Sequence, residues 1–179
     1  MDNFKNLFFN KRVLVTGHTG FKGSWLSLWL HHLGAIVTGV ALDPPTNPSL
    51  FNLASIGDLV NDYRLDIRNL VELQSVINNT EPDFVFHLAA QSLVQLSYSN
   101  PRETYETNII GTLNVLESLR TLTKPCVVVM ITSDKCYENL EWVWGYREND
   151  RIGGSDPYSA SKGAAELVIS SYIKSFFQK

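Results

Sequence analysis

Short apolar runs that alternate with helical patterns constrain the fold of this 179-residue chain more than any other feature. The runs are rich in Val and Ile and apolar almost throughout, which is typical of parallel strands covered on both faces. They span residues 12–16, 36–42, 84–88 and 127–132, with a weaker fifth at 60–65. Helical periodicity fills residues 23–33, 70–78, 101–122 and 157–177. This order predicts an α/β fold, a doubly wound parallel sheet of the Rossmann-like type with right-handed crossovers.

The composition favours a soluble domain that acts on a small molecule. The chain is 44% hydrophobic and 18% charged, with a formal net charge of -3 and scattered Lys and Arg. This gives no sign of a nucleic-acid or membrane partner. No apolar run approaches the roughly 20 residues of a membrane span, and the first residues do not lead into a signal-peptide core. We therefore expect a cytoplasmic protein.

A glycine-rich turn follows the first expected strand and opens the first expected helix. In this context backbone N–H groups and a helix N-terminus can hold a pyrophosphate. A GxxGxxG spacing alone could be a mere tight turn, but Asp43 follows about 20 residues later, where a carboxylate can accept ribose hydroxyls. Asp43 would also repel a 2'-phosphate, which favours NAD over NADP. The turn residues expected to bind the cofactor are Gly17, Thr19, Gly20, Phe21, Lys22 and Gly23.

The end of the weak strand at 60–65 leaves two interpretations open. Asp66 and Ile67 would suit the amine and the ring face of the adenine. Alternatively, Asp66 caps the helix that starts near Asn69.

Reactive side chains cluster after the last expected strand. The tract Thr132-Ser133-Asp134-Lys135-Cys136-Tyr137 follows it directly. Further on, Tyr158 and Lys162 are four residues apart on a helix, where a lysine ammonium can stabilise an ionised phenol. Ser133 can hydrogen-bond the reacting oxygen. These groups can together remove a proton from an alcohol.

With these residues the chain resembles, over essentially its whole length, the extended short-chain dehydrogenase/reductase superfamily. Further matching pieces are His87-Leu88-Ala89-Ala90 and Thr107-Asn108. The resemblance implies a bound nicotinamide cofactor and a Ser133, Tyr158 and Lys162 triad. It also implies that the cofactor lies against Leu88, Ala89, Ala90, Thr107, Asn108, Thr132, Tyr158 and Lys162.

Within that superfamily the chain resembles the CDP-glucose 4,6-dehydratase family. Nucleotide-sugar 4,6-dehydratases carry a hydroxyl, an Asp and usually a Glu here, whereas sugar epimerases lack the acidic pair. This chain has Asp134 but Lys135 in place of Glu. The same resemblance extends along the aromatic segment 142–148, in a loop at 138–156 that we expect to form a lid or a wall of the site.

The resemblance implies an NAD-dependent dehydration of a nucleoside-diphosphate sugar. Tyr158 would take the proton of the 4-hydroxyl, and Asp134 would donate a proton to the leaving 6-hydroxyl. Lys135 would act as the base at C5, for which burial beside Lys162 would favour the neutral amine. It could instead stabilise an enolate as a cation, or be an ordinary solvated lysine. An epimerase, a reductase or a non-catalytic NAD-binding module are the alternative functions.

Three further expectations concern organisation. Enzymes of this type are usually longer and bind the sugar nucleotide mainly through a C-terminal domain, so residues 1–179 are expected to be the cofactor half and to turn over poorly alone. A homodimer or higher homo-oligomer is expected through apolar faces on two long helices. The four histidines lack metal-ligand spacing, so no metal is expected, and Trp25 and Trp29 are expected in the core. The apolar helix faces comprise Leu113, Leu116, Leu119, Leu167, Ile169, Ile173 and Phe176.

Overall fold

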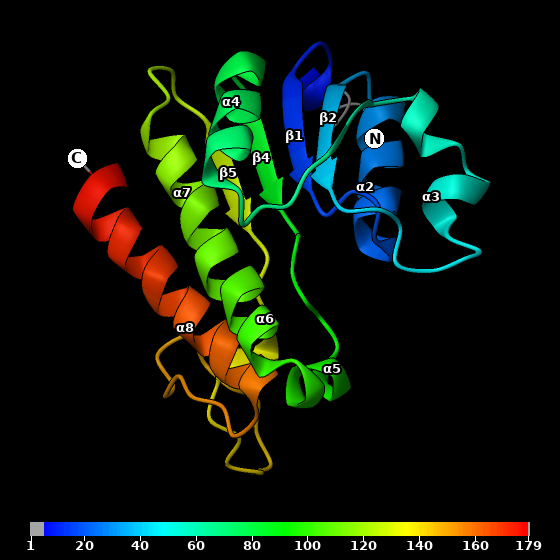
Figure 1. The fold of residues 1–179 in the computed structure, drawn as a ribbon. Helices are drawn as coiled ribbons and strands as arrows, with labels where there is room; N and C mark the ends of the chain where they lie inside the picture. The colour runs from blue at the N-terminus through cyan, green and yellow to red at the C-terminus, as the bar shows by residue number, and fades with distance from the viewer. Residues whose placement is uncertain (1–5, 179) are drawn as a thin grey trace.

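The computed structural model describes residues 6–178 and contains a five-stranded parallel sheet in the order β3-β2-β1-β4-β5 (Figure 1). Neighbouring strands pair in register, with Val15 opposite Gly39 on one side and Phe86 on the other. The predicted fold class and all five predicted strands are therefore confirmed. The strands are β1 (Arg12–Thr16), β2 (Ile36–Ala41), β3 (Asn61–Arg64), β4 (Phe84–His87) and β5 (Val127–Met130).

The connecting helices follow the predicted pattern with one internal irregularity. The expected helix at 101–122 is continuous in space but contains a π-helical segment, η2, in its middle. Short helices at 50–53, 56–58, 94–99 and 134–136 were not predicted, because each is too short to show periodicity. The long helices are α2 (Phe21–His32), α4 (Leu70–Thr80), α6 (Pro101–Tyr105) with η2 (Glu106–Gly111) and α7 (Thr112–Arg120), and α8 (Pro157–Tyr172) with η4 (Ile173–Phe177). The short ones are α3 (Leu50–Leu53), η1 (Ile56–Asp58), α5 (Val94–Ser99) and η3 (Asp134–Cys136).

Local capping determines where α8 begins. Asp156 is its N-cap: one carboxylate oxygen accepts the Ser159 N–H at 3.0 Å and the other accepts the Ser159 hydroxyl at 2.6 Å. Pro157 occupies the first helical position, where a missing N–H costs nothing. These two residues place Tyr158 in the first turn of the helix.

Two apolar clusters hold the sheet between helices. Along β1, Leu14 faces one side while Val13 and Val15 face the other, because side chains alternate along a strand. The Leu14 cluster includes Leu73 of α4 and Val115 of α7. The opposite cluster includes residues of α2 and of the turn after it. No helix within residues 6–178 is long and apolar enough to cross a bilayer.

The sequence predicts that β5 is covered on both faces, but part of this strand is exposed. Val127 and Val129 are 55% and 40% exposed. The strand pairs with β4 only, and α2, which covers the Val13 and Val15 face, packs on β1 and β2. The expectation that Trp25 and Trp29 lie in the core is also wrong, since both are more than half exposed on α2.

Candidate functional site

The candidate residues gather where the carboxyl ends of the parallel strands meet. The glycine-rich turn follows β1, Asp43 follows β2, residues 88–90 follow β4 and Ser133 follows β5. Helix α8 packs on η3, which follows β5, so it lies beside the β5 end. This edge of a doubly wound sheet is where such folds bind ligands.

The glycines of the turn are required by close backbone contacts. Gly17 has a φ of +75°, and a Cβ there would lie 2.8 Å from the backbone nitrogen of Ala89. A Cβ on Gly23 would lie 2.1 Å from the Gly17 carbonyl oxygen. At Gly20, the N-cap of α2, a Cβ would meet only that same oxygen, at 3.4 Å, and no side chain caps the helix. The start of α2 is therefore open to an anion, as a pyrophosphate site requires.

The other turn residues expected to bind the cofactor differ in their exposure to solvent. Thr19 is 5% exposed, and its hydroxyl donates to the Leu42 carbonyl at 2.9 Å, so it ties the turn to the end of β2. Phe21 is 72% exposed and Lys22 is also exposed. The Thr19 side chain thus serves the turn itself, while Phe21 and Lys22 face solvent.

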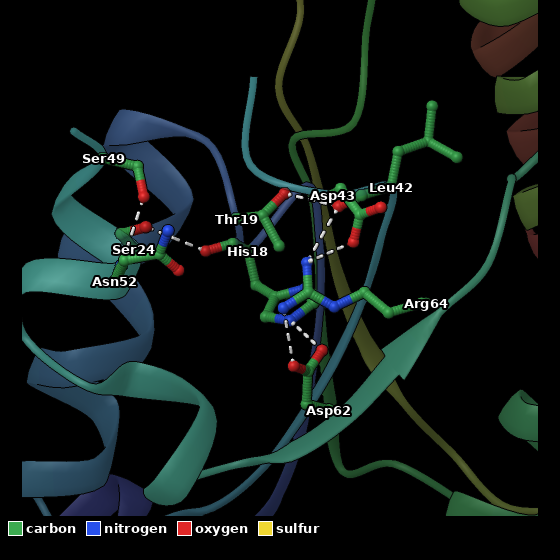
Figure 2. A network of polar contacts seen from close by, with 9 residues as sticks. All are labelled: His18, Thr19, Ser24, Leu42, Asp43, Ser49, Asn52, Asp62 and Arg64. Carbon is green, nitrogen blue, oxygen red and sulfur yellow. Dashed lines mark hydrogen bonds and ion pairs between the residues drawn. The ribbon is translucent and has the colours of Figure 1, made fainter. Parts of the chain in front are cut away.

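A polar network that the sequence did not predict joins the turn to β2 and β3 (Figure 2). His18 is fully buried, and its Nε2 lies 2.8 Å from Asp62 Oδ1. Arg64 donates from Nη2 to Asp62 Oδ2 at 2.7 Å, and its Nη1 lies 3.7 Å from Asp43 Oδ1. Burial lowers the pKa of His18, although Asp62 opposes this shift. The absence of a side chain at Gly39 makes room for the His18 ring.

The alternative in which Asp66 caps a helix is wrong. Asn69 is the N-cap of α4, and its side chain accepts the Glu72 N–H at 3.3 Å. Asp66 accepts the backbone N–H of Arg68 and two guanidinium N–H groups at 2.6–2.9 Å. Burial would raise the pKa of Asp66, but the bonds from Arg68 outweigh it and lower the pKa. Ile67 is 4% exposed in the core, so its side chain already has packing partners.

The end of β4 is organised around a buried histidine. The Thr16 hydroxyl oxygen accepts the N–H groups of Leu88 and Ala89, both at 3.1 Å, and lies 2.7 Å from Nδ1 of His87. The Thr16 proton is therefore directed to Nδ1, and His87 donates from Nε2 to Thr112 at 3.1 Å. Burial and the charge of Lys162 lower the pKa of His87 to about 3. The chain at residues 88–90 is thus held by a neutral imidazole and a threonine.

Asn108 links this segment to α8. It is 1% exposed; its side chain accepts the Gln91 N–H at 2.8 Å and donates to the Gln91 carbonyl at 3.0 Å and to the Ser161 hydroxyl at 2.8 Å. Thr107 beside it is half-buried. Both lie in the π-helical segment η2, a distortion often found at functional sites. Asn108 therefore holds the helix that carries Tyr158 and Lys162.

Tyr158 and Lys162 lie one turn apart on α8 and are 8% and 6% exposed. Burial lowers the pKa of Lys162, and the carboxylate of Glu166 opposes this shift. Glu166 also accepts a hydrogen bond from the Thr132 hydroxyl. Among the described residues it is the one α8 side chain that hydrogen-bonds to the 131–136 segment. Glu166 was not predicted, although its i, i+4 spacing from Lys162 was a visible signal.

Ser133, Asp134 and Lys135 form a small surface cluster. Ser133 caps η3 by accepting the Lys135 N–H at 3.2 Å, and its hydroxyl donates to Asp134 Oδ1 at 3.2 Å. Asp134 Oδ2 lies 3.4 Å from the Lys135 ammonium, and the two side chains are 77% and 60% exposed. The expected burial of Lys135 is therefore wrong for this structure, because the tract turns outward at η3.

The 138–156 loop is folded around an aromatic stack. Tyr137 and Tyr146 are parallel with ring centroids 5.4 Å apart, and Trp142 packs on Tyr146 at 5.5 Å. The Tyr146 hydroxyl donates to Asn139 Oδ1 at 3.0 Å. The stack begins at Tyr137, two residues after Lys135 in the sequence, and holds residues 139–146 of the loop together. Residues 6–178 contain no group of three His, Cys, Asp or Glu side chains placed to hold a metal ion.

The chain is similar to enzymes that act on sugar nucleotides. Residues 14–177 match the family described as GDP-mannose 4,6 dehydratase. CDP-glucose 4,6-dehydratase of Salmonella typhimurium is 58% identical over 173 residues, which cover 97% of this chain and 48% of that protein. UDP-glucose 4-epimerase of Thermotoga maritima, solved with UDP-glucose, superposes with a TM-score of 0.78 at 26% identity, covering 92% of this chain and 52% of that one.

A second solved structure carries a cofactor. MoeE5 in complex with UDP-glucuronic acid and NAD has a TM-score of 0.71 at 29% identity, covering 89% of this chain and 48% of that one. The chain thus spans about half the length of the relatives it matches.

Proposed function

Since this chain belongs to the GDP-mannose 4,6 dehydratase family, we propose that it binds NAD and supplies the reacting groups for 4,6-dehydration of a nucleoside-diphosphate hexose. The proposed substrate is CDP-glucose, because the Salmonella relative at 58% identity bears that activity in its name. The product would be the 4-keto-6-deoxy sugar. One observation carries the proposal: the Ser133, Asp134 and Lys135 cluster and the buried pair on α8 come from two packed elements at the carboxyl edge of the sheet.

The residues present fit an NAD molecule. The close approach at Gly17 and Gly23 and the open start of α2 suit a pyrophosphate, and the carboxylate of Asp43 is 92% exposed beside them. NAD, when bound, supplies the acceptor for the hydride of C4 and its later return to C6. Asp43 would receive the ribose hydroxyls and repel a 2'-phosphate.

In the oxidation, Tyr158 takes the proton of the sugar 4-hydroxyl. Lys162 stabilises the phenolate with an ammonium that burial leaves poorly solvated. Ser133 donates a hydrogen bond to the same sugar oxygen. Glu166 and Asn108 position these groups, because one holds Thr132 and the other holds Ser161 between Tyr158 and Lys162.

The elimination requires an acid at the 6-hydroxyl and a base at C5. A single proton transfer from the Lys135 ammonium to the Asp134 carboxylate, 3.4 Å away, would create both at once. When a bound sugar excludes water, the ion pair loses its solvation and the neutral pair becomes accessible. Lys135 then removes the C5 proton, Asp134 protonates the departing hydroxyl, and water leaves.

The test is formation of a 4-keto-6-deoxy sugar from CDP-glucose. Because the chain spans about half of its relatives, the assay has two arms: the chain itself, and a chimera in which it replaces the matching 173 residues of the Salmonella enzyme. We expect the chimera to produce the keto sugar, detected by its ultraviolet absorbance in alkali. Lys135→Met should abolish C5 deuterium exchange from heavy water while leaving C4 oxidation intact. Exchange and dehydration at the native rate would contradict the role of Lys135.

A sugar-nucleotide 4-epimerase is the second candidate, favoured by the likeness to the Thermotoga maritima epimerase. An epimerase would use Tyr158 and Lys162 but would not need Asp134. Asp134→Asn separates the two: it should block dehydration in a dehydratase and leave 4-epimer formation unchanged in an epimerase. The dehydratase is preferred because Asp134 and Lys135 lie at the β5 end, next to Ser133.

Self-association belongs to the same proposal. The side chains of Leu116, Leu119 and Ile169 are buried within the chain itself. By contrast, Leu167 on α8 is 61% exposed and Phe176 on η4 is 46% exposed. These two side chains are the proposed contact between copies. Light scattering should show a dimer or larger species that Leu167→Glu dissociates; an unchanged mass would exclude this surface.

A further inference from the structure

Arg64 lies beside Asp43, the residue proposed to bind the adenosine ribose of NAD. Its Nη1 is 3.7 Å from Asp43 Oδ1, at the adjoining ends of β3 and β2 (Figure 2). The same nitrogen donates to the Leu42 carbonyl at 3.2 Å. A cation and an anion therefore share the position expected for the adenosine ribose.

A hydrogen bond and an aromatic contact fix the orientation of the Arg64 guanidinium. Nη2 donates to Asp62 Oδ2 at 2.7 Å, while Asp62 Oδ1 is 2.8 Å from the buried His18 of the glycine-rich turn. The guanidinium carbon lies 4.7 Å from the centre of the Phe51 ring, a cation–π contact. The orientation of Arg64 is thus coupled to the turn that would hold the pyrophosphate, and binding would require little reordering of the side chain.

Arg64 also retains free hydrogen-bonding capacity. A guanidinium has five N–H donors, and within residues 6–178 the bonds to Asp62 and Leu42 use two of them. The side chain is 34% exposed, and Asp43 beside it is 92% exposed. Arginine forks match the geometry of phosphate oxygens, so the spare donors have a natural ligand class.

We propose that Arg64 is a latent 2'-phosphate-binding residue, which the Asp43 carboxylate of the proposed NAD site keeps from binding that phosphate. Without the Asp43 carboxylate, Arg64 binds the 2'-phosphate of NADP. This inference rests on the proposed NAD site and adds Arg64 to it. Asp62 and His18 are positioning residues for Arg64.

The test measures dissociation constants of NAD and NADP by calorimetry for the wild-type chain, Asp43→Ser, and Asp43→Ser combined with Arg64→Met. The wild-type chain should bind NAD at least about 100-fold more tightly than NADP, since the 2'-phosphate meets a carboxylate. Asp43→Ser should tighten NADP at least about tenfold and weaken NAD about tenfold, the worth of charge-assisted bonds to the ribose. Adding Arg64→Met should remove the NADP gain and leave the NAD affinity within about threefold of that of Asp43→Ser.

Two results would overturn the proposal: no NADP gain in an Asp43→Ser variant that still binds NAD, or a gain that survives Arg64→Met. Methionine keeps the stem that packs on Phe51, and circular dichroism checks the fold. If the double variant does not fold, Arg64→Gln in the Asp43→Ser background replaces it, and NADP binding as tight as in Asp43→Ser would count against the proposal. Failure of the wild-type chain to bind NAD would instead contradict the proposed function.

Discussion

The buried His87 makes the stability of this protein depend on pH in a calculable way. Its imidazole is 3% exposed, between the hydroxyls of Thr16 and Thr112. Burial and the charge of Lys162 lower its pKa to about 3, from 6.5 in an exposed histidine. Between these values the unfolded chain binds a proton that the folded chain does not. Stability is therefore lost as the pH falls below 6.5.

The magnitude follows from the two pKa values. Each pH unit below the unfolded value costs about 1.4 kcal/mol, so this site removes about 2 kcal/mol of the free energy of unfolding between pH 7 and pH 5. The variant His87→Gln keeps a side chain that can hydrogen-bond both threonines but does not titrate. We expect it to lose about 2 kcal/mol less than the wild-type chain over the same interval. Urea unfolding followed by circular dichroism at several pH values measures the difference.

The interval from pH 7 to pH 5 separates the effect of the histidines on stability from that of the carboxylates. Carboxylates with a lowered pKa, such as Asp66 and Asp156, lose their contribution only below about their ordinary 3.8. The buried His18 shifts stability in the same direction, but it is present in both proteins. His32→Gln, at an exposed position of α2, is the matched control and should keep the wild-type pH dependence. An equal loss in His87→Gln and the wild-type chain would refute the reasoning.

Three further changes have definite expected outcomes. Lys162→Met should raise the free energy of unfolding by about 1 kcal/mol, because it removes a buried charge kept for function, whereas the exposed Lys174→Met should change it by less than about 0.5 kcal/mol. A destabilised Lys162→Met in urea would show that the ammonium has a stabilising partner. Gly23→Ala would place a Cβ 2.1 Å from a backbone oxygen and should abolish NAD binding in calorimetry; normal binding would mean that the turn is not the site. Asn114→Ala unpairs the carbonyl groups of residues 67 and 68 and should cost about 1–3 kcal/mol by urea unfolding, against no change for the exposed Asn79→Ala.

The sheet was predictable because each strand is a local apolar pattern with turn residues at its ends. All five strands were placed to within two residues. The exposure of Val127 and Val129 was not predictable, because burial of a strand depends on what packs against it and not on its own residues. The π-helical segment inside the helix at 101–122 was also missed, since helical periodicity barely changes over one wide turn.

The candidate site was predictable where its signals are short-range, as in the glycine-rich turn and the spacing of Tyr158 and Lys162. Asp62, the partner of His18, lies 44 residues away, and the partners of Asn108, Gln91 and Ser161, lie 17 and 53 residues away, so no local pattern reveals them. Lys135 was placed correctly at the β5 end but was expected to be buried. Its exposure depends on the direction that the chain takes at η3, which no local pattern reveals.

The central claim is that Tyr158 begins a dehydration on an NAD-bound site, and product analysis with CDP-glucose tests it most directly. The chimera described above, supplied with NAD and CDP-glucose, should form the 4-keto-6-deoxy sugar. Its Tyr158→Phe variant should still bind NAD in calorimetry but lose product formation at least about 100-fold, the usual contribution of a general base. Equal product formation by the two proteins, or a 4-epimer with no loss of water, would contradict the account.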